Sequence, residues 1–176
     1  SDSRPILRYL ALPRSRPPLL VSPPLVILVV LASPTGYPAL DVSKEFNAIE
    51  GALAALRAEK TVQIERLESP TIEALNAYLE QNPVHVLHFV GHGVYQEDQG
   101  QLLFEDAEGN GHLVTATALA QLLHNHSSLR LVYLNACEGA IASNRDIFAG
   151  LAQTLVQEGV PAAIAMQYAI SDEAAI

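Results

Sequence analysis

Two hydrophobic patterns alternate along the chain from residue 25 onward. Continuous runs of Val, Ile and Leu, such as residues 25–32, are typical of strands buried on both faces of a sheet. Between these runs, apolar residues recur every three or four positions, which is the spacing of an amphipathic helix. The patterns predict strands at 25–32, 62–67, 84–90, 129–134 and 162–167, and helices at 43–59, 71–80, 115–124 and 147–158.

The segment between the third predicted strand and the third predicted helix follows a different pattern. Residues 101–104 and 111–114 flank a turn-rich stretch, and this arrangement predicts a β-hairpin. Strands that alternate with helices need crossover connections, which build a mainly parallel sheet covered by helices on both faces. We therefore predict an α/β fold, a three-layer sandwich with a small β-hairpin. Functional groups of such sheets lie beyond the carboxyl ends of the strands.

Residues 1–24 differ in composition from the rest of the chain. They hold six of the eleven prolines, four arginines and one aspartate, a net charge of +3. Residues 25–176 hold 6 basic and 18 acidic groups, a net charge of −12. Because proline interrupts helices, we expect an extended arm or linker at 1–24 and one folded domain at 25–176. A domain of charge −12 repels phosphate backbones, so we expect no direct binding to nucleic acid.

The apolar runs and the cysteine content argue against a membrane-spanning, secreted or disulfide-linked protein. The longest apolar run has eight residues, whereas a membrane helix needs about 20. The first residues are polar or proline, unlike a signal peptide. Cys137 is the only cysteine, which excludes an internal disulfide and a multi-thiolate zinc site. We expect a cytoplasmic protein with a free thiol and no membrane partner.

Two reactive side chains directly follow predicted strands. His92 stands between Gly91 and Gly93, and Cys137 stands in the string Asn-Ala-Cys-Glu-Gly at 135–139. If the two strands are neighbours, the imidazole and the thiol meet at one edge of the sheet, where the imidazole can deprotonate the thiol. The glycines would let the backbone turn sharply at His92 and approach a ligand closely. The backbone N–H groups of Gly93 and Cys137 are suited to form an oxyanion hole.

These two motifs carry a resemblance to a known family. Cys137 follows His92 by 45 residues, close to the caspase spacing of about 50. The chain resembles the CHAT family, caspase-like peptidase domains often found with tetratricopeptide repeats in bacteria. The resemblance covers roughly residues 25 to 176 and rests on four strings: VHVLHFVGHG at 84–93, LRLVYLNACEGA at 129–140, FAGLAQTLVQEGVPAAIAMQ at 148–167 and ISDEAA at 170–175.

The resemblance implies a cysteine endopeptidase of caspase-like fold that needs no cofactor. His92 would be the histidine of the catalytic dyad, Cys137 the nucleophile, and the amide of Gly93 an oxyanion donor. Glu138 follows the cysteine where caspases have arginine, and nothing matches the arginines that give caspases their aspartate preference. We therefore do not expect cleavage after aspartate.

The resemblance also implies a setting for the domain. Its partners would be a protein or peptide substrate and a regulatory domain or partner protein of repeat or sensor type, within a larger bacterial protein or complex. Domains of the family continue past the Ser-Asp-Glu segment at 171–173. We expect the domain to be incomplete at its C-terminal end.

Two further sites have competing interpretations. Asp172 follows the last predicted strand and could line a substrate pocket for a basic residue, but the same residues could cap the first turn of a helix. His85, His88 and His92 resemble a series of metal ligands. Because residues 85 and 88 of a strand point to opposite faces, we predict no metal site.

Two other function classes remain open. A degraded caspase-like fold could serve as a non-catalytic protein-interaction module. A nucleotide-binding domain of flavodoxin type would have the same layers, although Ser-Pro-Thr-Gly at 33–36 stands where a phosphate-binding glycine loop would be.

Overall fold

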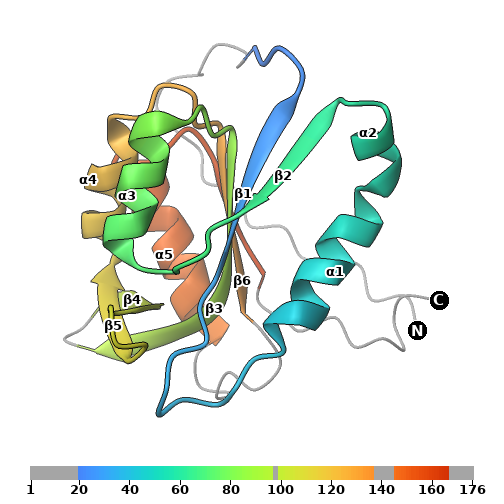
Figure 1. The fold of residues 1–176 in the computed structure, drawn as a ribbon. Helices are drawn as coiled ribbons and strands as arrows, with labels where there is room; N and C mark the ends of the chain where they lie inside the picture. The colour runs from blue at the N-terminus through green and yellow to red at the C-terminus, as the bar shows by residue number, and fades with distance from the viewer. Residues whose placement is uncertain (1–19, 97–98, 137–144, 167–176) are drawn as a thin grey trace, which may run out of the picture.

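A seven-stranded sheet lies between two layers of helices (Figure 1). The computed structural model describes residues 20–96, 99–136 and 145–166. Five strands of the sheet run parallel, and two further strands join them as an antiparallel hairpin. The predicted α/β three-layer sandwich with a small hairpin is confirmed.

The elements follow one another in the predicted order. The strands are β1 (Leu25–Leu31), β2 (Val62–Arg66), β3 (Val86–Gln96), β4 (Gln99–Glu105), β5 (Gly111–Thr115), β6 (Leu131–Ala136) and β7 (Ala163–Ala165). The helices are α1 (Val42–Ala52), α2 (Ala54–Ala58), α3 (Ile72–Gln81), α4 (Ala116–His124) and α5 (Arg145–Gln157). Within the described ranges, every helix is too short or too polar to cross a membrane.

Each face of the sheet has its own hydrophobic core. Helices α3, α4 and α5 cover one face, and the larger core there includes Leu28, Phe89 and Phe148. Helices α1 and α2 lie on the other face (Figure 1), and the smaller core there includes Val29 and Val90. Adjacent residues of β1 and of β3 thus enter different cores, as the pleat of a strand requires. Burial on both faces explains why these strands read as continuous apolar runs.

The helix predicted at 43–59 is two helices. The first, α1, begins after Asp41, whose carboxylate accepts the backbone N–H of Lys44 at 2.9 Å. It ends at Ala52. The next residue, Leu53, donates its N–H to the carbonyl of Ile49, and α2 starts directly after Leu53. Glycine has a low helix propensity, and Gly51 in the last turn of α1 accounts for the break that the apolar spacing alone does not predict.

The strand predicted at 84–90 differs more, and the difference affects the site. Strand β3 continues through Gly91, His92 and Gly93 to Gln96, so the predicted end of the strand at residue 90 is wrong and the chain does not turn at His92. Up to Gly91 the strand pairs in parallel with β6, and from His92 onward it pairs antiparallel with β4. Glycine permits a turn, but here the hairpin provides a new strand partner and the chain stays extended.

Candidate active site

His92 lies where β3 changes its partner. Gly91 is the last residue of β3 paired with β6, opposite Ala136, and His92 is the first paired with β4, opposite Leu103. The side chain of His92 is buried, with 4% of the residue's surface exposed. The structure therefore places this imidazole at the carboxyl end of the parallel part of the sheet, where α/β folds carry their functional groups.

The glycines on either side of His92 make room for two phenyl rings of the larger core. A Cβ on Gly91 would lie 2.7 Å from Cζ of Phe89, and a Cβ on Gly93 would lie 2.6 Å from Cε2 of Phe148. Both distances are shorter than real Cβ contacts. Because successive residues of a strand point to opposite faces, His92 points away from these rings, toward the face that carries the smaller core.

The imidazole of His92 meets the loop that connects β1 to α1. Its Nε2 atom lies 2.8 Å from the carbonyl oxygen of Pro38, which is hydrogen-bond distance. A carbonyl oxygen can only accept, so Nε2 carries the hydrogen and donates it. In the neutral ring Nδ1 is then the unprotonated, basic nitrogen. Pro38 is a site residue that sequence analysis missed.

Tyr37, the neighbour of Pro38, lies beside the imidazole. The two ring centroids are 6.3 Å apart and the ring planes differ by 29°. Tyr37 also packs against the hairpin, because a Cβ on Gly111 would lie 2.7 Å from its Cε2 atom and 2.9 Å from Cδ1 of Leu103. The β1–α1 loop, the hairpin and β3 thus meet at His92.

Strands β3 and β6 are neighbours, as the predicted meeting of His92 and Cys137 requires. They pair in parallel over six positions, from Val86 opposite Leu131 to Gly91 opposite Ala136. His92 and Cys137 directly follow the two residues of that last pair in the sequence. Cys137 and Asp172 themselves lie outside the described residues.

His88 is the other histidine within β3, and it lies on the same face of the strand as His92. Its ring lies edge-on to that of Tyr133 on β6, with the centroids 4.6 Å apart. Burial lowers the pKa of His88 to about 4, so its ring is neutral near neutral pH. Its Nε2 atom is buried and has no hydrogen-bond partner among the described residues.

His85 lies just before β3 and has a structural contact of its own. Its Nδ1 atom accepts the backbone N–H of Val26 at 2.9 Å, which ties the start of β3 to β1. Burial, and secondarily the charge of Arg130, lower the pKa of His85. Within the described ranges, no group of three or more His, Cys, Asp or Glu side chains could hold a metal ion.

The sheet order, the helices on both faces and the histidine at the strand end define a caspase-like α/β domain. The family model of the CHAT domain matches residues 5–176. The chain therefore belongs to the CHAT domain family, whose fold is caspase-like. The match begins inside the segment 1–24 that composition sets apart. A comparison with curated protein sequences finds no significant match.

Proposed function

We propose that this protein is a cysteine endopeptidase in which Cys137 is the nucleophile and His92 is the general base. The observation that carries the proposal is the hydrogen bond from Nε2 of His92 to the carbonyl of Pro38. It orients the ring and leaves Nδ1 as the basic nitrogen. The pairing of Gly91 with Ala136, the residues directly before His92 and Cys137, supports the same assignment.

The first half of the reaction forms an acyl-enzyme. Nδ1 of His92 takes the proton from Sγ of Cys137, and the thiolate attacks the carbonyl carbon of the scissile peptide bond. The backbone N–H groups of Gly93 and Cys137 are the expected donors to the oxyanion. The attack produces a tetrahedral intermediate. When it collapses, the C–N bond breaks and the imidazolium of His92 gives its proton to the leaving amine.

The second half of the reaction releases the acid product. Water attacks the thioester carbonyl while Nδ1 of His92 accepts a proton from the water. The C–S bond breaks, and the proton returns from Nδ1 to Sγ of Cys137, which restores the starting state. The carbonyl of Pro38 stays bonded to Nε2–H throughout, so the ring keeps its orientation while Nδ1 gains and loses a proton.

The family membership supports a wider proposal about the setting. The substrate would be a protein or peptide, and a repeat or sensor domain, or a separate partner protein, would control access to the site. The protein would act in the bacterial cytoplasm, where a single thiol stays reduced. Asp172 remains a proposed contact for a basic residue of the substrate.

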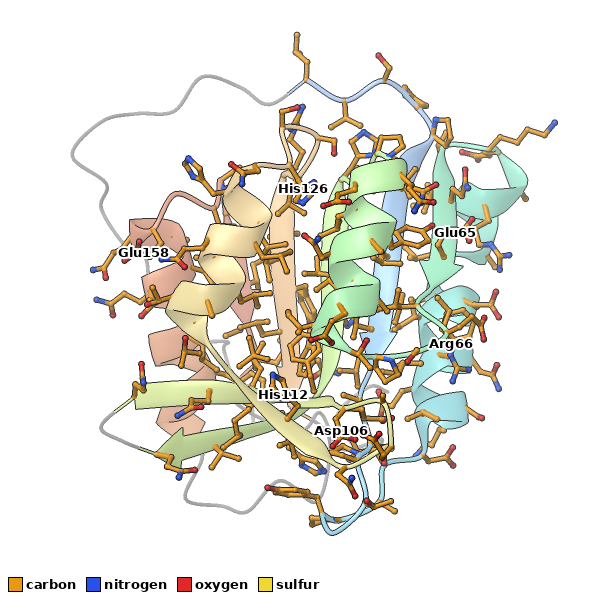
Figure 2. The ribbon with its side chains drawn as sticks, turned by 60° about the vertical axis from the view of Figure 1, so that its left-hand side comes forward. Glu65, Arg66, Asp106, His112, His126 and Glu158 are labelled. Atoms are coloured by element: carbon orange, nitrogen blue, oxygen red, sulfur yellow. The ribbon has the colours of Figure 1, made fainter. Side chains whose placement is uncertain are left out.

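The test is labelling with a peptide that carries an electrophile for thiolates, combined with cleavage of a peptide library. Wild-type protein is compared with Cys137→Ala and His92→Gln. The matched control is His112→Gln, because His112 is exposed on β5 of the hairpin (Figure 2). We expect no labelling of Cys137→Ala, labelling of His92→Gln slower by about 10²-fold or more, and wild-type behaviour of the control.

Two outcomes would contradict the proposal. Equal labelling of wild-type and Cys137→Ala would show that the probe does not report a reactive Cys137. Equal rates for wild-type and His92→Gln, at the rate of an ordinary free thiol, would favour the non-catalytic interaction module. Either result is read from the chemistry of the thiol itself and does not depend on the identity of the physiological substrate.

A further inference from the structure

The loop at residues 33–40, which supplies the carbonyl of Pro38, is closed by one of its own residues. The Oγ atom of Ser33, at the start of the loop, accepts the backbone N–H of Leu40, at its end, at 3.0 Å. The backbone N–H of Ser33 in turn donates to Oε1 of Glu105, at 2.9 Å. Glu105 is the last residue of β4, so a hairpin carboxylate holds the loop at the point where it closes.

The middle of the same loop is attached to the tip of the hairpin. The backbone N–H of Thr35 donates to the carbonyl of Gly109 at 2.9 Å, and its hydroxyl lies 3.1 Å from Oδ1 of Asn110. Asp106 shapes this tip, because its carboxylate accepts the backbone N–H of Asn110 at 2.7 Å. That hydrogen bond is the main reason why the pKa of Asp106 is lowered. Figure 2 shows Asp106 at this end of the molecule.

Strand β4 therefore contacts both His92 and the loop that carries Pro38. Leu103 pairs with His92 across the β3–β4 ladder. Glu105, two residues further on and on the same face of β4, holds the loop that carries Pro38. The donor and the acceptor are 54 residues apart in sequence, yet β4 pairs with the donor residue and holds the acceptor's loop at Ser33.

We propose that Glu105 is a positioning residue for His92. By accepting the N–H of Ser33, its carboxylate fixes the loop so that the Pro38 carbonyl receives Nε2–H and Nδ1 remains the basic nitrogen. Ser33 takes part as well, because its N–H donates to Glu105 while its hydroxyl oxygen accepts the N–H of Leu40 at the other end of the loop. The catalytic consequence rests on the proposed function, whereas the effect on the imidazole hydrogen bond does not.

Loss of the Glu105 carboxylate should displace the loop because the N–H of Ser33 is half-buried. Without an acceptor, this group must find another partner, and the loop moves to provide one. A displacement of about 1 Å in a catalytic group can cost about 10²-fold in rate. The Nε2–H of His92 would also exchange faster with water, since exchange requires that its hydrogen bond opens.

The test compares Glu105→Leu, which removes the acceptor, with Glu105→Gln, which keeps an oxygen acceptor in the same shape. The control is Glu108→Leu, because Glu108 is an exposed glutamate in the turn that connects β4 to β5. The first readout is the exchange rate of the His92 Nε2 proton, measured by NMR on histidine-labelled protein and assigned with His92→Gln. The second is kcat and KM for a cleaved peptide.

We expect Glu105→Leu to exchange this proton on the order of tenfold faster and to lose kcat by about tenfold, with KM little changed. Glu105→Gln and the control should behave as wild-type. A folded Glu105→Leu with wild-type exchange would overturn the proposal. If that variant does not fold, Glu105→Ala decides in the same way, because it also removes the acceptor for the N–H of Ser33. Altered exchange in a protein that cleaves no peptide would instead reject the proposed function and keep the positioning role.

Discussion

His88 and His92 lie on one strand and on one face of it, yet their surroundings differ. His88 lies within the parallel part of β3, beside Tyr133, without a described polar partner for its Nε2 atom, and its pKa is lowered to about 4. His92 lies where the strand changes partner, and its Nε2 atom donates to the carbonyl of Pro38. Both side chains are substantially buried, so burial alone does not distinguish a candidate catalytic histidine. What distinguishes His92 from His88 is the carbonyl of Pro38, a polar partner that orients the ring.

The largest expected effect separates the two histidines by activity. His92→Gln should lower kcat/KM for peptide cleavage by about 10³-fold, because general acid–base catalysis contributes about 10²–10⁴-fold. His88→Gln should retain most of the activity, since its ring is not part of the proposed dyad. Steady-state cleavage of one peptide by both variants measures the difference. Equal losses would mean that the comparison does not reflect catalysis.

The next effect separates them by acid stability. The pKa of His88 is about 4 when folded and about 6.5 when unfolded, so the unfolded state binds the proton more tightly. Stability from the neutral ring is present above pH 6.5, falls as the pH drops below that value, and is lost below about pH 4. The contribution of His88 to the free energy of unfolding therefore changes by about 3 kcal/mol between pH 6.5 and pH 4. His88→Phe should remove that part of the pH dependence.

Urea unfolding of wild-type and His88→Phe at pH 7 and pH 4 measures this contribution. The difference between the two proteins isolates His88, because all other titrating groups are shared. A pH dependence that is the same in both proteins would show that the His88 ring is not held neutral by its surroundings.

A smaller effect concerns the residues that flank the two histidines. Leu87 and Phe89 flank His88, whereas glycines flank His92, and a Cβ on Gly93 would collide with Phe148. Gly93→Ala should lower the free energy of unfolding by about 2 kcal/mol through overpacking. Gly150→Ala is the control, since nothing lies within 4 Å of its Cβ position, and it should be neutral or stabilising in helix α5. Thermal unfolding of both variants, together with Gly93→Ala/Phe148→Leu as a rescue, provides the measurement.

The smallest effect concerns Tyr37, which packs beside His92. Because 42% of its surface is exposed, Tyr37→Leu should cost less than about 1 kcal/mol. A double-mutant cycle with His92→Gln should give a coupling of about 0.5 kcal/mol. A coupling near zero would show that the two rings are merely adjacent.

The strands and helices could be predicted from local patterns because burial determines the periodicity of each element. The hairpin at residues 99–115 is an example, since turn residues separate two short strands there. The position of His92 at the end of the parallel pairing also followed from its place after an apolar run. The end of β3 could not be predicted, because the strand continues only through its pairing with β4, a contact that local sequence does not encode.

The role of Pro38 could not be predicted, for a related reason. Its contribution is a backbone carbonyl, which every residue has, so no residue type signals it. Glu105 has no recognisable motif either, and only the folded loop shows that its carboxylate receives the N–H of Ser33. Both roles depend on segments that are distant in sequence. The roles of Cys137 and Asp172 stay predictions, since these residues lie outside the described ranges.

The glycines beside His92 bear on how this motif would diverge among related chains. Gly91 and Gly93 face Phe89 and Phe148, so the packing of the core requires these glycines, whereas only the proposed catalysis requires His92. Under the proposed function, a relative without peptidase activity could replace the histidine but would still need both glycines while the phenylalanines remain. Glycines without a histidine would then mark an inherited fold, and only the complete triplet would suggest an inherited reaction.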